Sequence, residues 1–190
     1  PENVRQAAKE EEWDRALAYL QEASSEPRKE YPGLTAELLL RFGRVEEAHD
    51  IMTAYLSGKD ASRVSARLRL LRIYILLAQK RPYLAYCYLF SENAPQAVDS
   101  SVDRFWRLAQ VETALDTGRP GQSLDLAGEL RKDSSLSQAG EQDKLVREVA
   151  ALRRIQALLA RGERGTAWEE VQSLPISLAR MLKTPQAMAK

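Results

Sequence analysis

The sequence predicts an all-α protein, a right-handed superhelical solenoid of about five antiparallel helix-turn-helix hairpins closed by a C-terminal capping helix. Three observations carry this prediction: the composition, a recurring helix-turn-helix pattern, and central helices that are apolar on two faces. Among the 190 residues, Leu and Ala number 53, whereas Val, Ile and Thr number 20. Because helices favour the first group and strands the second, an all-β fold is excluded.

Apolar periodicity, interrupted by turn residues, places eleven helices along the chain. Segments such as Tyr31-Pro32-Gly33, Ser57-Gly58 and Leu174-Pro175 separate them. The expected helices cover residues 2–10, 13–24, 34–42, 45–57, 61–79, 82–91, 99–117, 120–132, 140–161, 164–173 and 176–183. Residues 1–190 are expected to form a single helical-repeat domain, and the start at Pro1 indicates a segment of a longer protein.

One turn pattern recurs three times without gaps. The three stretches are Ala36-x-x-Leu39-x-x-x-Gly43-x-x-x-x-Ala48, Val111-x-x-Ala114-x-x-x-Gly118-x-x-x-x-Ser123 and Ile155-x-x-Leu158-x-x-x-Gly162-x-x-x-x-Ala167. Glycine tolerates positive φ where a helix ends in a tight turn, and the small residue five positions later lets two helices approach closely. Two further units place Glu11 and Lys80 at the turn position, and Pro82 follows Lys80 at the start of the next helix.

This pattern resembles the tetratricopeptide repeat, a helix-turn-helix unit of about 34 residues, along nearly the whole chain. Pro27, Pro95 and Pro175 fall after expected second helices, where that family places a helix-ending proline. The turn positions are 32 to 44 residues apart, so the repeats are irregular. The resemblance implies that the first helix of each hairpin lines a concave, peptide-binding face, on which basic residues resemble carboxylate clamps.

The helix expected at 61–79 is apolar on two opposite faces, at about 100° per residue. One stripe contains Val64, Leu68, Leu71 and Ile75, and the other contains Ala66, Leu70, Ile73 and Leu77. A helix needs two apolar stripes only when it has neighbours on both sides. The segment 102–115 is also apolar around most of its circumference, whereas 45–57 has the single apolar face of an outer helix. Stacked hairpins are therefore predicted rather than a four-helix bundle.

The sequence shows no constellation typical of an enzyme, a metal site or a cofactor site. His49 and Cys87 are the only residues of their kinds, and one of each makes neither a zinc site nor an oriented nucleophile. His49 is expected at the surface, and Cys87, within an apolar run, in the core. Carboxylate pairs such as Glu46-Glu47 diverge on their helix, and Thr117-Gly118-Arg119 lacks the strand and the lysine of a phosphate loop. We therefore expect a protein that is not an enzyme and holds no cofactor.

Charge distribution suggests where a partner binds. The net charge is +1, which gives no overall field toward nucleic acid, but residues 1–50 carry −5 and residues 59–81 carry +6. The candidate partner-binding residues, taken from the basic segment and the next first helix, are Arg63, Arg67, Tyr74 and Arg107. A second candidate surface is the aromatic run Tyr83–Phe90, for which burial between hairpins is the simpler interpretation.

These features predict a non-catalytic scaffold that docks another protein or peptide, without nucleic acid and without membrane insertion. Arg exceeds Lys by 20 to 8, which hints at a GC-rich bacterial genome and, by analogy of fold, at an envelope assembly for secretion, pilus formation or exopolysaccharide export. The alternative is a ligand-sensing domain of a regulatory protein. A scaffold predicts an open groove, whereas a sensor predicts an enclosed pocket of roughly 300 Å³ or more with convergent polar groups.

Overall fold

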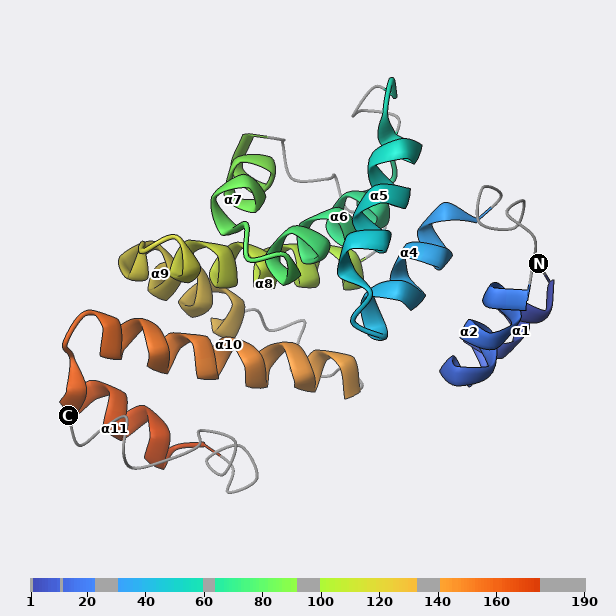
Figure 1. Cartoon of the computed structure of the whole chain (residues 1–190). Helices are drawn as coiled ribbons and strands as arrows, with labels where there is room; N and C mark the ends of the chain where they lie inside the picture. Colours follow the sequence, from blue (N-terminus) through green and yellow to red (C-terminus); the bar gives the residue numbers. More distant parts are fainter. Residues whose placement is uncertain are drawn as a thin grey trace. The chain divides into compact units, whose positions relative to one another are not determined.

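The computed structural model describes residues 2–10, 12–22, 31–59, 64–91, 100–132 and 141–174, and within these ranges the regular secondary structure is entirely helical (Figure 1). The helices described are α1 (Glu2–Lys9), α2 (Trp13–Glu22), α4 (Pro32–Arg41), α5 (Val45–Leu56), α6 (Ala66–Ala78), α7 (Pro82–Ser91), α8 (Ser100–Asp116), α9 (Pro120–Lys132), α10 (Glu141–Ala160) and α11 (Arg164–Gln172).

Nine of these ten helices begin and end within two residues of the bounds expected from the sequence. The exception is α6, for which the expected start at residue 61 is wrong. Val64 and Ser65 precede the helix, and Ser65 has an extended backbone, with φ −59° and ψ 147°. Its hydroxyl accepts a hydrogen bond of 3.5 Å from the N–H of Leu68, so Ser65 is an N-cap. The capping helix expected at 176–183 lies outside the described residues.

The hairpin turns share one backbone geometry. The turn residues Gly43, Gly118 and Gly162 have φ between 72° and 80°, and Lys80 takes the same position with φ 60°. The residue after each of them donates its N–H to the carbonyl five positions earlier, in bonds of 2.8 to 2.9 Å, as in a Schellman motif. Glu12 makes the same bond to Ala7. Lys80 therefore adopts a left-handed conformation that glycine would adopt at lower cost.

The three positions that define the sequence pattern are buried in every hairpin. They lie seven and four residues before the turn and five residues after it, and each side chain is at most 4% exposed. These residues are Val4, Ala7, Ala16, Ala36, Leu39, Ala48, Ile73, Leu76, Ala85, Val111, Ala114, Ser123, Ile155, Leu158 and Ala167. The one polar member, Ser123, donates its hydroxyl to the carbonyl oxygen of Val111 at 2.9 Å, which satisfies it across the α8–α9 pair. The predicted repeat register is confirmed at these positions.

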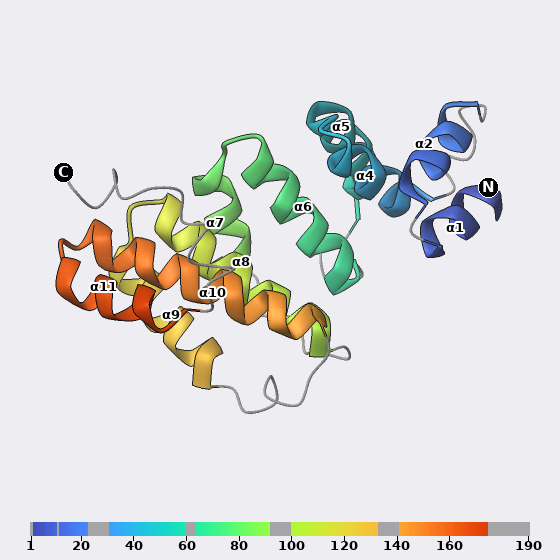
Figure 2. The same ribbon diagram turned by 90° about the horizontal axis from the view of Figure 1, so that it is seen from below.

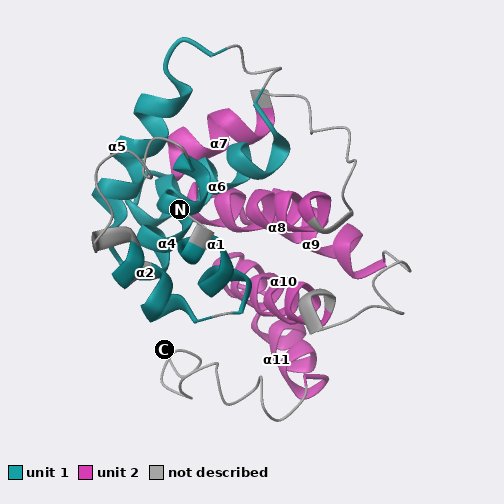
Figure 3. Ribbon diagram, turned by 90° about the vertical axis from the view of Figure 1, so that its right-hand side faces the viewer, with its two compact units in different colours: residues 1–81 teal, residues 82–190 magenta. Residues whose placement is uncertain are grey.

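The chain divides into two compact units, residues 1–81 and 82–190 (Figure 3). In the first unit α1 packs on α2, α4 on α5, and α6 on both α4 and α5. One apolar cluster joins α1, α2 and α4 through Val4, Ala7, Ala16 and Leu38. A second cluster joins α4, α5 and α6 through Ala36, Leu39, Ala48, Met52 and Ile75.

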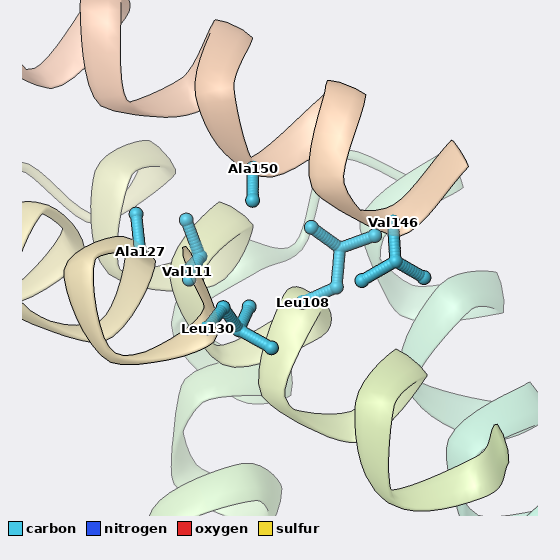
Figure 4. Packing of buried hydrophobic residues seen from close by; sticks show 6 residues of the cluster. All are labelled: Leu108, Val111, Ala127, Leu130, Val146 and Ala150. Atoms are coloured by element: carbon cyan, nitrogen blue, oxygen red, sulfur yellow. The ribbon is translucent and has the colours of Figure 1, made fainter. Parts of the chain in front are cut away.

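The second unit has a core shared by three helices. α8 packs on α7, α9 and α10, while α9 and α11 also pack on α10. α10 and α11 run side by side in two perpendicular views (Figures 1 and 2). Figure 4 shows the cluster that α8, α9 and α10 build together from Leu108, Val111, Ala127, Leu130, Val146 and Ala150.

The burial pattern confirms which helices are apolar on two faces. On α6, Ile75 lies in the cluster with α4 and α5, and Leu70 and Ile73 on the opposite stripe are buried as well. α8 buries residues around most of its circumference, among them Trp106, Ala109 and Val111. α5 buries only Ala48 and Met52, on a single face, as an outer helix should.

Candidate functional site

A pocket of about 380 Å³ lies in the first unit, where α1, α2, α4 and α6 meet. Three of these four are the first helices of their hairpins. The described lining consists of Arg5, Ala8, Lys9, Trp13, Gly33, Leu34, Glu37, Arg67, Leu68 and Leu71. The pocket opens to solvent, and the side chain of Arg67 on its rim is 76% exposed.

Four of the ten described lining residues come from matching positions of successive repeats. Arg5 and Glu37 each lie six residues before their turn position, at residues 11 and 43. Leu34 and Leu71 each lie nine residues before theirs, at residues 43 and 80. Because helices with the same turn geometry present matching positions in the same direction, the pocket lies on one common face of the first helices.

The inner part of the pocket is apolar. Ala8, Trp13, Leu34, Leu68 and Leu71 supply it, and all but Ala8 and Trp13 come from α4 and α6. At Gly33, a Cβ atom would lie 2.5 Å from Cδ2 of Leu68, so the glycine is what lets the Leu68 side chain rest on the first turn of α4. The width of the pocket between α4 and α6 therefore depends on a residue without a side chain.

Charged side chains form the rim. Glu37 accepts a hydrogen bond of 3.1 Å from Nη2 of Arg67 and one of 3.3 Å from Nη2 of Arg41. The Arg41 guanidinium also lies 4.1 Å from the ring centre of Trp13. Arg5, Lys9 and Arg67 supply three positive charges to the lining, against the one carboxylate of Glu37. The described rim therefore carries an excess of positive charge.

The predicted partner-binding residues have different surroundings in the structure. Arg67 lines the pocket. Tyr74, half-buried, lies on α6 three residues beyond the lining residue Leu71. Arg107 is exposed on α8, in the second unit, and its Nε donates to Oδ2 of Asp103 at 3.0 Å. Arg63 lies outside the described residues.

The sequence interpretation missed most of the lining, in particular Arg5, Lys9, Trp13, Leu34 and Glu37. These residues are far in sequence from the basic segment 59–81, which contains most of the predicted binding residues. The signal that could have found them is the repeat register, since Arg5 matches Glu37 and Leu34 matches Leu71 once the turns are aligned.

The aromatic run on α7 corrects two expectations. The expected burial of Cys87 is wrong, because Cys87 is exposed, and the expected burial of the run is confirmed only in part, because Tyr83 is 65% exposed. The buried residues of α7 are Ala85 and Leu89, which lie four apart on the opposite side of the helix from Tyr83 and Cys87. The small residue of the repeat, Ala85, thus decides which side of α7 faces inward.

Between these two sides, Tyr86 contacts Phe90 on α7, Arg119 in the turn before α9, and Gln122 on α9. Its ring centre lies 4.3 Å from that of Phe90 and 4.3 Å from the guanidinium carbon of Arg119. Its hydroxyl donates to Oε1 of Gln122 at 3.1 Å. The polar tip of the tyrosine is therefore satisfied within the second unit.

The described residues show no grouping of three or more His, Cys, Asp or Glu side chains suited to a metal ion. His49 is half-buried, and its Nε2 lies 3.5 Å from the hydroxyl oxygen of Thr53. None of the helices described is long and apolar enough to span a membrane.

Comparison with models of protein families, with curated proteins and with solved structures yields no match for the chain.

Proposed function

We propose that the chain is a non-catalytic interaction scaffold of tetratricopeptide-like hairpins, stacked as a right-handed solenoid, that docks a segment of another protein. The observation that carries this proposal is the 380 Å³ pocket lined by three first helices, which contribute two pairs of residues at matching repeat positions. In an array of stacked hairpins, the first helices form one continuous face, and a partner binds along it.

Two further features support the proposal. The helices pack as hairpins with their neighbours in sequence, as the α1·α2, α4·α5, α8·α9 and α10·α11 pairs do. The pocket combines an apolar floor with a charged rim, which is the composition of a protein-binding surface with a desolvated centre and polar edges. A bacterial envelope assembly, suggested by composition and analogy alone, is the setting that we propose.

A ligand-sensing domain is the second candidate, and the size of the pocket is the observation in its favour. A volume of about 380 Å³ falls within the range of small-molecule sites. Against it stands the exposed rim, because a small ligand is usually enclosed over most of its surface. We therefore place the scaffold first.

The test is affinity capture with the immobilised chain from an extract of the source organism, followed by titration of the purified candidate partner by calorimetry. We expect saturable binding that Arg67→Glu weakens about tenfold, a loss of about 1.4 kcal/mol, because the substitution reverses the charge of a rim residue that contacts the partner. The control Arg147→Glu, at an exposed position of α10, should leave the affinity within about twofold. If no protein binds saturably and a small molecule instead raises the melting temperature, the sensor is the correct function.

A further inference from the structure

We infer that the pocket of the first unit selects an internal peptide segment in which an apolar side chain stands next to acidic side chains. This inference rests on the proposed scaffold function and specifies the partner that the scaffold takes. It is carried by the combination of an apolar floor, an excess of cations on the rim, and a carboxylate that is already neutralised.

The floor selects the apolar side chain. Leu34, Leu68 and Leu71 are all only partly buried, so their remaining exposed surface can be covered by a ligand. Burial of that surface against a Leu, Ile or Phe side chain is favourable in proportion to the apolar area removed from water. A purely charged segment would leave this floor uncovered.

The rim selects acidic side chains. Glu37 already accepts hydrogen bonds from both Arg41 and Arg67, so it has little capacity to attract a basic ligand. Arg5 and Lys9 lie four residues apart on α1, and therefore on the same face of that helix. A carboxylate entering the pocket meets these two cations and can also compete with Glu37 for the exposed guanidinium of Arg67.

The distribution of the cations favours an internal segment over a single terminal carboxylate. Arg5 and Lys9 come from α1, whereas Arg67 comes from α6. α4, which carries Glu37, lies between them in the packing order, since it shares an apolar cluster with α1 and also packs on α6. Cations on both flanks of α4 match an extended peptide that crosses α4 and carries acidic groups at more than one position.

The aromatic rings near the pocket argue against nucleic acid as the ligand. The Trp13 ring is covered by Arg41 at 4.1 Å, and the Tyr31 ring by Arg5 at 4.3 Å. Proteins that bind single strands use open aromatic faces on which bases stack. In this protein a guanidinium group already lies over the Trp13 ring and another over the Tyr31 ring.

The experiment uses the whole chain and a library of random peptides displayed within a surface loop of a carrier protein, so that neither end of the peptide is free. We expect the selected peptides to combine Asp or Glu with Leu, Ile or Phe. A synthetic peptide of the enriched sequence, amidated and acetylated and labelled for fluorescence anisotropy, then gives the dissociation constant.

Four variants of the chain make the test specific. Lys9→Glu and Arg67→Glu should each weaken the peptide at least tenfold, and Arg147→Glu should change its affinity less than twofold. Glu37→Gln should strengthen binding about threefold, because it releases Arg67 and removes the competing carboxylate without a change of shape. All four positions are at least partly exposed, and circular dichroism of each variant checks that it is folded.

Four outcomes would overturn the inference, and the last of them would overturn the proposed function as well. Enrichment of basic or uncharged peptides, or an affinity that Lys9→Glu and Glu37→Gln leave unchanged, would contradict the acidic preference. Failure of every peptide to bind, while the purified partner protein still binds in a manner sensitive to Arg67→Glu, would refute peptide recognition but leave the scaffold function standing. If neither a partner protein nor any peptide bound the chain, the scaffold function itself would be refuted.

Discussion

Two ion pairs at related repeat positions show how the units differ. Glu37 and Glu112 each lie six residues before a turn glycine, and each pairs with an arginine of the next first helix. In the first unit the Arg67 and Glu37 side chains are 76% and 24% exposed, whereas Arg153 and Glu112 in the second unit are 30% and 15% exposed. Arg153 holds Glu112 with two hydrogen bonds, of 2.9 and 3.2 Å. The arginines differ in register, since Arg67 lies 13 residues before its turn position and Arg153 lies nine. The matched glutamate is thus part of the pocket rim in one unit and of a partly buried link between α8 and α10 in the other.

The described apolar clusters are built alike in the two units. In the second unit α8–α9–α10 form one cluster and α9–α10–α11 form another, and in the first unit α1–α2–α4 and α4–α5–α6 form separate clusters. The pocket lies against α4, the helix common to both clusters of the first unit. What the comparison teaches is that one hairpin design can place a glutamate of the same register at the rim of a pocket or in a partly buried ion pair, depending on the arginine that the next first helix supplies.

The largest expected difference in stability comes from leucine-to-alanine substitutions, which make a cavity in each of the two regions. Leu130→Ala removes a fully buried side chain of the second unit and should lower the free energy of unfolding by about 3 kcal/mol. Leu71→Ala removes a half-buried pocket residue, and its cost should be about 1 kcal/mol because less area returns to water. Denaturation in guanidinium chloride, followed by circular dichroism, measures both. Equal losses would show that the pocket floor is as tightly packed as the core.

Double-mutant cycles on the two ion pairs should give the next largest difference. We expect a coupling energy of about 1.5 kcal/mol for Glu112→Gln with Arg153→Met, because partial burial strengthens the attraction. The same substitutions in the exposed pair, Glu37→Gln with Arg67→Met, should couple by about 0.3 kcal/mol. The couplings come from urea unfolding of the single and double variants at low and high salt. A stronger coupling for Glu37 and Arg67 would reverse the comparison and make that pair a structural one.

Substitutions in the turns should change the free energy of unfolding least. We expect a gain of stability in the first unit and a loss in the second. Lys80→Gly should raise the free energy of unfolding by about 0.5–1 kcal/mol, because glycine adopts φ 60° without strain. Gly118→Ala should lower it by about 1 kcal/mol for the same reason. An added Cβ at Gly118 would meet no atom within 4 Å, so that cost belongs to the backbone alone. Differential scanning calorimetry measures both variants, and a loss of stability in Lys80→Gly would mean that the lysine side chain stabilises the turn.

Most of the secondary structure could be predicted from the sequence, for a local physical reason. A turn glycine, or Lys80 in its place, fixes where one helix ends and the next begins, and the small residue five positions later fixes which side faces inward. Ala48, Ser123 and Ala167 are all buried for this reason. The error at Cys87 arose because the apolar composition of α7 was given more weight than this register, which assigns the buried side to Ala85.

The pocket could not be predicted in the same way, because it is made of residues that are distant in sequence. Arg5 and Arg67 are separated by 62 positions, and only packing through α4 brings them to one lining. A search for runs of positive charge finds Arg67 but not Arg5 or Lys9, which stand in an acidic part of the chain. Matching positions between repeats, rather than local composition, carry the information about this site.

The central claim is that the face of the first helices binds a partner at the pocket of the first unit, whereas in the second unit the Arg153–Glu112 pair links α8 and α10 on that face. Methyl NMR spectra of the leucine- and valine-labelled chain, titrated with the selected acidic peptide, test it most directly. We predict shifts at Leu34, Leu68 and Leu71, and none at Leu108, Val111 or Leu130. Shifts confined to the second unit, with the pocket leucines unchanged, would contradict the account.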